Sequence, residues 1–334
     1  MHSNNLFCRT LFFVLVVSFL HSCSGDQDQY DFTDFAVKDT ASINKFKISD
    51  NENNHIVISR DNENQKWLIE GTNHQANKAS VNLLMETFYR IRVKQDVPNS
   101  AFNTVINRLS VRHKKVELYN GNDKPFKTWY IGSPTQDHQG TYMLLENKDL
   151  KSSKPYITYK PGMYGTLDVR FFTDSIIWRS SKVFHYPNSN DIQKISVEFN
   201  TRPNESYTIE RNNNTVYLYG NNNEIISNYD SSQVRHYLTH YNKINYNKIM
   251  LVKQSIKDSI FSQIPHTTFG LTDINGKVIN VEFWNILDNN SETGWDKEYG
   301  FIRVNKNQEL LRVQFFSWEI LFKPLSYYKR DIIK

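Results

Sequence analysis

The chain has 334 residues, of which 39% are hydrophobic and 14% aromatic, so it can bury one large core or two cores of ordinary domain size. Its net charge of +5 is a small excess of 40 basic over 35 acidic residues, and no block of Lys and Arg stands out. These values exclude a disordered chain, and they lack the basic patch that is typical of a nucleic-acid-binding protein.

The first 22 residues have the pattern of a signal peptide. Arg9 precedes an uninterrupted apolar run over residues 11–20, and the polar sequence HSCSGDQDQ follows. The alternative is a short transmembrane anchor, but this run is too short for a bilayer, which needs about 20 apolar residues. We therefore predict a signal peptide over residues 1–22 and export of the mature chain.

The end of this segment, LHSC at residues 20–23, resembles the bacterial lipobox, in which the cysteine receives the lipid. The only other cysteine, Cys8, lies within the signal peptide, so a disulfide framework, a thiol enzyme and a cysteine-ligated zinc site are excluded for the mature chain. We predict lipidation at Cys23 and anchoring in the cell envelope; the alternative is a free thiol. Ser24 replaces the Asp that retains such proteins at the inner membrane in some bacteria, which favours the outer membrane.

A polar segment rich in Asp and Gln follows the lipidation site. Such a composition offers little apolar surface for a core. We predict that residues 23–41 form a lipidated, flexible tether between the membrane and the folded part of the chain.

The rest of the chain contains two similar halves. The sequence INKFKISDNENNHIVISRDNENQKWLIEG begins at Ile43, and it corresponds to IQKISVEFNTRPNESYTIERNNNTVYLYG, which begins at Ile192. In both halves alternating strands bounded by Asn, Asp and Gly turns precede a helix and further strands. We predict an α+β fold of two tandem similar units, residues 42–188 and 189–334, each with antiparallel strands, one long helix and further strands. The alternative is a chance likeness between two β-rich segments.

One helix is predicted in each unit from apolar residues that recur at helical spacing. They form one core-facing stripe in each helix: Val81, Leu84, Phe88 and Ile91 in the first, and Val234, Tyr237, Tyr241 and Ile244 in the second. Each helix is therefore expected to pack on the sheet of its own unit.

The sequence IGSPTQDHQGTYMLLEN, residues 131–147, places Ser133, Asp137 and His138 within six positions. These are the side-chain types of a hydrolytic triad, but triads are usually assembled from segments far apart in the sequence. The loop joins two alternating strand sequences through Gly and Pro turn formers, and the G-x-S-x-G elbow is absent. We interpret it as the turn of a hairpin and predict no catalytic residue in it.

His236 and His240 are spaced i, i+4 on the predicted second helix, so both could face one metal ion. Tyr237 stands where the zincin motif needs its Glu, and we interpret the pair as a solvated helix face. No phosphate-binding glycine motif occurs in the sequence. We predict no metal, cofactor or nucleotide, and we assign the aromatic runs FYRIRV, FFTDSIIW and FFSWEILF to the core rather than to a carbohydrate platform.

The chain resembles the domain-of-unknown-function 4340 proteins, which are anchored envelope proteins common in the Bacteroidota. Four segments carry the resemblance: FAVKDTASINKFKISD, WYIGSPTQDHQGTYMLLEN, YGTLDVRFFTDSIIWRSSKVF and LLRVQFFSWEILFKPLSYY. It spans about residues 35–330, nearly the whole mature chain. The resemblance implies an envelope lipoprotein, and some relatives are associated with gliding-type ABC transporter components. It carries over no functional residue.

These observations favour a non-catalytic lipoprotein that binds or scaffolds another component of the cell envelope. Its expected partners are the membrane, through the lipid on Cys23, and an envelope protein, but neither a nucleic acid nor a nucleotide. The alternative is an envelope hydrolase or glycan-acting enzyme whose site the sequence does not reveal.

Overall fold

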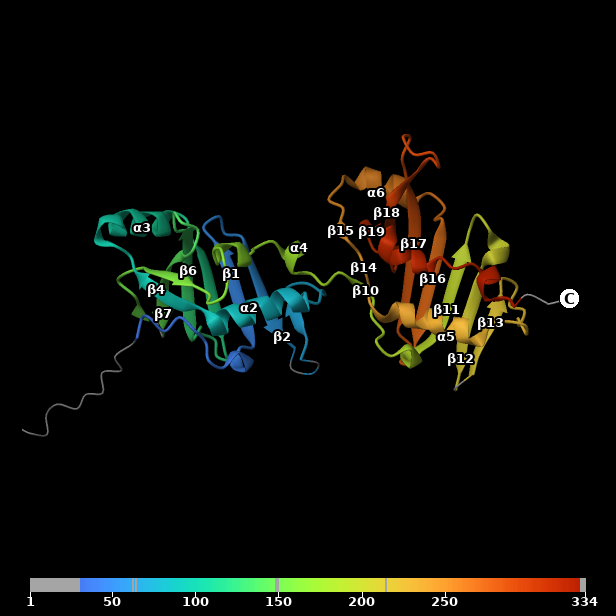
Figure 1. Cartoon of the computed structure of the whole chain (residues 1–334), viewed down its shortest axis with the longest axis horizontal. Coiled ribbons are helices and arrows are strands. Elements are labelled where there is room, and N and C mark those ends of the chain that lie inside the picture. Colours follow the sequence, from blue (N-terminus) through green and yellow to red (C-terminus); the bar gives the residue numbers. More distant parts are fainter. Residues whose placement is uncertain (1–30, 62, 64, 148–149, 214, 331–334) are drawn as a thin grey trace, which may run out of the picture. The chain divides into compact units, whose positions relative to one another are not determined.

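The chain divides between Trp178 and Arg179 into two units. The computed structural model in Figure 1 describes residues 31–61, 63, 65–147, 150–213 and 215–330. The predicted signal peptide, residues 1–22, and the predicted lipidation site, Cys23, lie outside the described residues. Among the residues that are described, no helix is long and apolar enough to cross a membrane.

The first unit is built on an antiparallel sheet whose strands lie in the order β3-β2-β1-β5-β6-β7-β9-β4, with β8 paired to β7. Its elements are β1 (Lys45–Asp50), β2 (His55–Arg60), β3 (Trp67–Ile69), α2 (Lys78–Arg90), β4 (Arg92–Asp96), α3 (Asn99–Val111), β5 (Lys114–Tyr119), β6 (Lys127–Pro134), β7 (Thr141–Asn147), β8 (Leu150–Lys151), β9 (Tyr156–Tyr159) and α4 (Ser175–Trp178).

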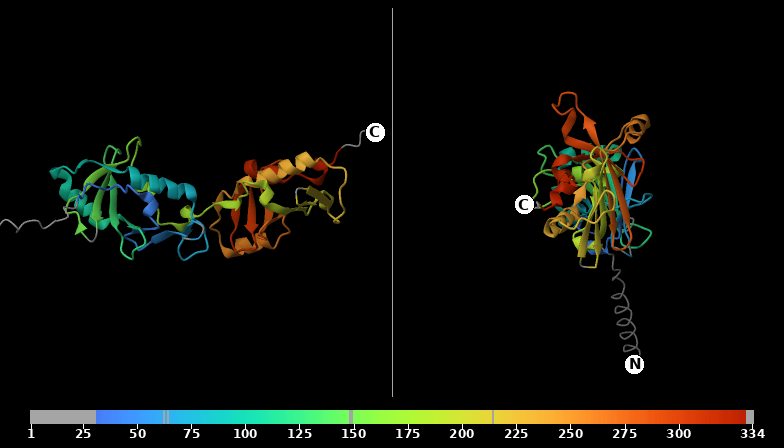
Figure 2. Two further views of the ribbon diagram at one scale, coloured as in Figure 1. Left: turned by 90° about the horizontal axis from the view of Figure 1, so that it is seen from below. Right: turned by 90° about the vertical axis from the view of Figure 1, so that its right-hand side faces the viewer.

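Two helices cover opposite faces of this sheet. The amide oxygen of Asn77 caps α2 by accepting hydrogen bonds from two backbone N–H groups of its first turn. The predicted stripe of α2 is buried, and the ring of Phe88 packs edge-on against Trp129 of β6 at 5.1 Å. On the other face, Val105 and Leu109 of α3 pack with Leu144 of β7. In Figure 1 and Figure 2, α2 runs across the strands of the sheet.

The second unit also contains an antiparallel sheet, with the order β13-β12-β11-β16-β17-β18-β19-β15. The unit also contains a separate two-stranded sheet, formed by β10 and β14. The elements are β10 (Lys182–Phe184), β11 (Ile192–Phe199), β12 (Tyr207–Asn212), β13 (Thr215–Gly220), α5 (Ser231–Thr239), β14 (Ile244–Asn245), β15 (Lys248–Ile249), α6 (Gln254–Phe261), β16 (Thr267–Asp273), β17 (Val278–Leu287), β18 (Trp295–Val304), β19 (Leu311–Gln314) and α7 (Phe315–Trp318).

The two sheets have the same strand order when the strands are numbered within each unit. Strands β1, β2, β3, β4, β5, β6, β7 and β9 correspond to β11, β12, β13, β15, β16, β17, β18 and β19. Helix α5 follows β13 as α2 follows β3, and α6 precedes β16 as α3 precedes β5. The predicted α+β class, with two large antiparallel sheets of similar size, is confirmed.

The prediction of one long helix in each unit was wrong. In the first unit α2 and α3 each have 13 residues, and in the second α5 has nine and α6 eight. The stripe of the second predicted helix is buried, but the α-helix ends at Thr239 and a 3-10 turn, η5 (His240–Asn242), carries Tyr241. Ile244 already belongs to β14.

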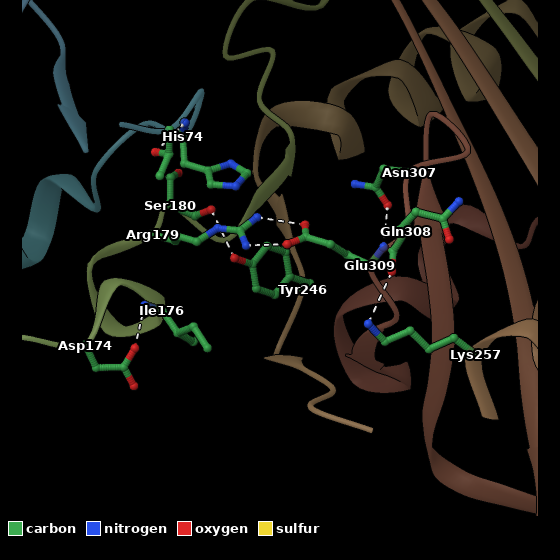
Figure 3. A network of polar contacts seen from close by, with 11 residues as sticks. His74, Asp174, Ile176, Arg179, Ser180, Tyr246, Lys257, Asn307, Gln308 and Glu309 are labelled. Atoms are coloured by element: carbon green, nitrogen blue, oxygen red, sulfur yellow. Dashed lines mark hydrogen bonds and ion pairs between the residues drawn. The ribbon is translucent and has the colours of Figure 1, made fainter. Parts of the chain in front are cut away.

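The second unit begins ten residues earlier than the boundary predicted after residue 188. Arg179 forms a two-point ion pair with Glu309, with Nη1–Oε1 and Nη2–Oε2 distances of 2.5 and 2.8 Å (Figure 3). The backbone N–H of Tyr246 donates to the carbonyl of Ser181. These contacts, together with the pairing of β10 with β14, hold residues 179–188 to the second unit.

The N-terminal strap, residues 31–38, falls inside the range predicted as tether but packs on the first unit. The side chains of Phe35 and Val37 are buried in its core, and the N–H of Val37 donates to the carbonyl of Phe88 at 2.8 Å. The predicted tether of residues 23–41 therefore reached too far into the folded chain, because apolar residues among the aspartates dock this segment.

Candidate functional site

Asp137 and His138 lie in the turn between β6 and β7, as interpreted from the sequence, whereas Ser133 belongs to the end of β6. The backbone N–H of His138 donates to the carbonyl of Thr135 at 3.0 Å, and His138 has a φ of 52°. The carboxylate of Asp137 accepts hydrogen bonds from the Thr135 hydroxyl and the Gln139 N–H, and these bonds lower its pKa. Asp137 thus stabilises the turn. Within the described residues, no hydrogen bond joins it to His138 or Ser133.

His236 and His240 lie beside each other, with ring centroids 4.8 Å apart. His236 is exposed and His240 half-buried. Burial lowers the pKa of His240, and the nearby His236 and Lys323 lower it further. Across the described part of the chain, no group of three His, Cys, Asp or Glu side chains is arranged to hold a metal ion.

A pocket of about 850 Å³ lies in the first unit, and it includes Ser133. Its wall is formed by the turn after β1, the last turns of α3, the first residues of β5, the end of β6 and the short 3-10 helix η2 (Asp168–Arg170). The volume is within the range of small-molecule binding sites. We call it the α3 pocket.

Gly132 allows α3 to lie close to the sheet at this pocket. A Cβ atom built on Gly132 would lie 2.6 Å from Cδ2 of Leu109, which is closer than van der Waals contact permits. A side chain at this position would therefore displace the Leu109 side chain and crowd the backbone carbonyl of Tyr142, which glycine avoids.

Asp50, one of the carboxylates that line the α3 pocket, is occupied by hydrogen bonds from the protein itself. The carboxylate of Asp50 accepts hydrogen bonds from the N–H groups of Glu52 and Asn54, from the Asn54 amide and from the Thr173 hydroxyl. Burial acts to raise the pKa of Asp50, but these hydrogen bonds outweigh it and the pKa is lowered. Asp50 therefore holds a turn and is poorly placed to accept a substrate proton.

The cations of the pocket are of two kinds. Lys114 is partly buried, its Nζ donates to the carbonyl of Asp168 at 3.2 Å, and burial lowers its pKa against the opposing charges of Asp168 and Asp50. Arg108 and Arg112 are exposed at the rim, and within the described residues neither forms an ion pair with a carboxylate. The pocket thus offers two guanidinium groups to a ligand.

Ser133 and His113 are the pocket residues whose types serve as nucleophile and base in hydrolytic sites. Among the described residues, no hydrogen bond joins Ser133 to a histidine or a carboxylate. The ring Nδ1 of His113 lies 2.8 Å from the carbonyl of Leu109 and 3.4 Å from the amide nitrogen of Asn51, so its neighbours are groups of the protein itself. A nucleophile paired with a base, which covalent hydrolysis requires, is not formed by these side chains.

Sequence reasoning missed Arg108, Arg112 and Lys114. The two arginines are spaced i, i+4 within NRLSVR, a pattern that any solvated helix can show. Only the fold brings them to Asp50 and Asp168, which lie in distant parts of the chain.

We compared the chain with protein-family models and with curated proteins, and neither comparison found a match.

Proposed function

We propose that this chain is a non-catalytic lipoprotein of the cell envelope that acts by binding, as a scaffold or accessory subunit. The observation that carries the proposal is the α3 pocket, in which Asp50 holds a turn of the protein while two arginines form no ion pair among the described residues. Such a site can hold a ligand through its arginines, and its Asp50 carboxylate is poorly placed to act as a base. The hydrolase alternative lacks a comparable observation.

The lipid on Cys23 is a second part of this proposal. Phe32 is the first residue of the strap that packs on the core of the first unit, so eight residues, 24–31, separate the proposed anchor from the folded body. Fully extended, eight residues span at most about 26–29 Å. An anchored protein would therefore present its first unit close to the membrane, where an envelope partner can be reached.

We further propose that the chain is a member of the domain-of-unknown-function 4340 family and that its two units arose by internal duplication. The shared strand order of the sheets supports the duplication. The outer membrane is the location we favour because Ser24 follows the lipidated cysteine. Envelope complexes of the ABC-transporter or gliding type are the first partners to test.

The test is the mass of the N-terminal peptide of the mature protein, combined with membrane fractionation. We expect the mature chain to begin at Cys23, to carry lipid and to sediment with membranes. Cys23→Ala should move the protein out of the membrane fraction, whereas the matched change Cys8→Ala, within the signal peptide, should leave it there. A Cys23→Ala protein that still fractionates wholly with membranes would contradict the anchor.

A further inference from the structure

We infer that the α3 pocket binds an anionic group, a carboxylate or a phosphate, through Arg108 and Arg112. The two residues are four positions apart on α3, so their side chains leave the same face of the helix. Both line the pocket. Guanidinium groups bind planar carboxylates and phosphates through paired hydrogen bonds, which gives such a site both strength and orientation.

Lys114 is the cation of the pocket that the protein's own aspartates offset, whereas the two arginines form no ion pair among the described residues. Lys114 lies against Asp168, and its charge is offset by Asp168 and Asp50. Arg112 is near enough to Lys114 to lower its pKa further, so positive charge accumulates on this side of the pocket. An anion placed between the arginines would relieve this repulsion.

The second unit shows that the fold does not require arginines in this helix. Helix α6 precedes β16 as α3 precedes β5, but α6 contains no arginine and ends at Phe261.

In that unit the aromatic residue packs into the protein. The ring of Phe261 lies 5.7 Å from Trp284, and the guanidinium of Arg303 lies 4.3 Å from the Phe261 ring. Trp284 occupies the strand position that Gly132 holds in the first unit, since Phe283 pairs with Thr267 as Ile131 pairs with Lys114. A cation near a helix C-terminus stabilises the helix, but α6 ends without one. The arginine pair is thus a feature of α3 that α6 does not share.

The rest of the pocket sets the size of the ligand. Its volume of about 850 Å³ exceeds that of a bare ion, and Val111, Ile131 and Pro134 add apolar surface next to the arginines. The geometry therefore points to a compact organic anion, or to the anionic end of a larger envelope molecule. This inference rests on the proposed binding function and names the class of ligand for it.

The experiment is calorimetric titration of the purified full-length protein at low ionic strength, with inorganic phosphate and with succinate as probes. We expect one binding site per chain for at least one probe, with affinity that falls as salt is added. The double variant Arg108→Gln, Arg112→Gln should weaken binding at least about tenfold. The matched control, Arg235→Gln with Lys253→Gln, removes the same charge from exposed positions of the second unit and should bind like the wild type.

Binding of phosphate alone or of succinate alone would assign the pocket to that class of anion. The inference is overturned if neither probe binds saturably by about 10 mM, or if the double variant, folded by circular dichroism, binds as the wild type does. Should the double variant fail to fold, each single change is titrated in its place, and unchanged affinity in both overturns the inference. Membrane fractionation tests the lipid anchor separately, so the proposals of a lipid anchor and of an anion site can fail independently.

Discussion

The side chain of Lys127 donates a 2.6 Å hydrogen bond to the backbone carbonyl of Asp34, 93 positions earlier in the chain. Its Nζ donates also to the carbonyl of Ala36 at 2.7 Å, and it lies 3.5 Å from the Asp34 carboxylate. Burial lowers the pKa of Lys127, while Asp34 acts to keep it charged. A buried ammonium on β6 therefore ties the N-terminal strap to the first unit.

Replacing Lys127 by Ala should destabilise the first unit by about 2–4 kcal/mol, because two carbonyls lose a charged donor in a buried place. The measurement is denaturant unfolding followed by tryptophan fluorescence, together with limited proteolysis at residues 31–38. Lys47→Ala is the matched control, since Lys47 is partly exposed and its ion pair with Glu117 is 3.9 Å long. Equal stability of Lys127→Ala and Lys47→Ala would refute the role of the strap.

A network of buried tyrosines should make the second unit sensitive to alkali. The hydroxyl of Tyr237 lies 2.9 Å from the hydroxyl of Tyr241 and 2.9 Å from the carbonyl of Leu321. The hydroxyls of Tyr207 and Tyr328 lie 3.1 Å apart. Burial raises the pKa of all four tyrosines. The folded state thus favours the neutral phenols, so their contribution to stability is complete below about pH 10 and is lost as pH rises above that value.

The ultraviolet absorbance of tyrosinate, followed with pH, should therefore rise in two phases. Exposed tyrosines ionise first, and the buried ones ionise only together with the loss of circular dichroism. Tyr237→Phe should cost about 1–2 kcal/mol, because it leaves the Leu321 carbonyl and the Tyr241 hydroxyl without this partner. A single reversible phase without unfolding would show that the tyrosines are accessible.

The helical and strand periodicity of the sequence predicts many of the residues that form the core. Phe88 and Tyr241 were placed in core-facing stripes, and both are fully buried. The sequence did not predict α3 and α6, because few of their residues form an apolar stripe. In α3 the buried residues are Val105 and Leu109, and α6 has no buried residue. Propensity and period are informative only where a stripe is long.

The α3 pocket was beyond sequence reasoning for a different reason. Asp50, Arg108, Gly132 and Asp168 come from four distant segments, and the strand register decides which of them meet. The docking of the strap, by contrast, is indicated in the sequence by the apolar residues Phe35 and Val37, although the surrounding aspartates favour a flexible tether.

The histidine pair should respond to acid but not to chelators. Because burial and the charges of His236 and Lys323 lower the pKa of His240, the folded state resists its protonation. Stability should therefore be unaffected above about pH 6.5 and fall as pH drops below it.

His240→Gln should reduce this loss of stability between neutral and acid pH, measured as the free energy of unfolding at both. The matched change His236→Gln, at an exposed position, should have the smaller effect. A chelator should leave the melting temperature unchanged; a large drop would show that the pair holds a structural metal.

The central claim, that this chain works by binding and not by catalysis, is tested most directly by complementation. A strain that lacks the protein is given a variant in which all five candidate catalytic or ligating residues are alanine: Ser133, Asp137, His138, His236 and His240. None of them lies in the buried core, so circular dichroism should match the wild type. We predict that this variant restores the phenotype of the deletion strain as fully as the wild type does. A folded variant that fails to restore it would contradict the account and favour the hydrolase.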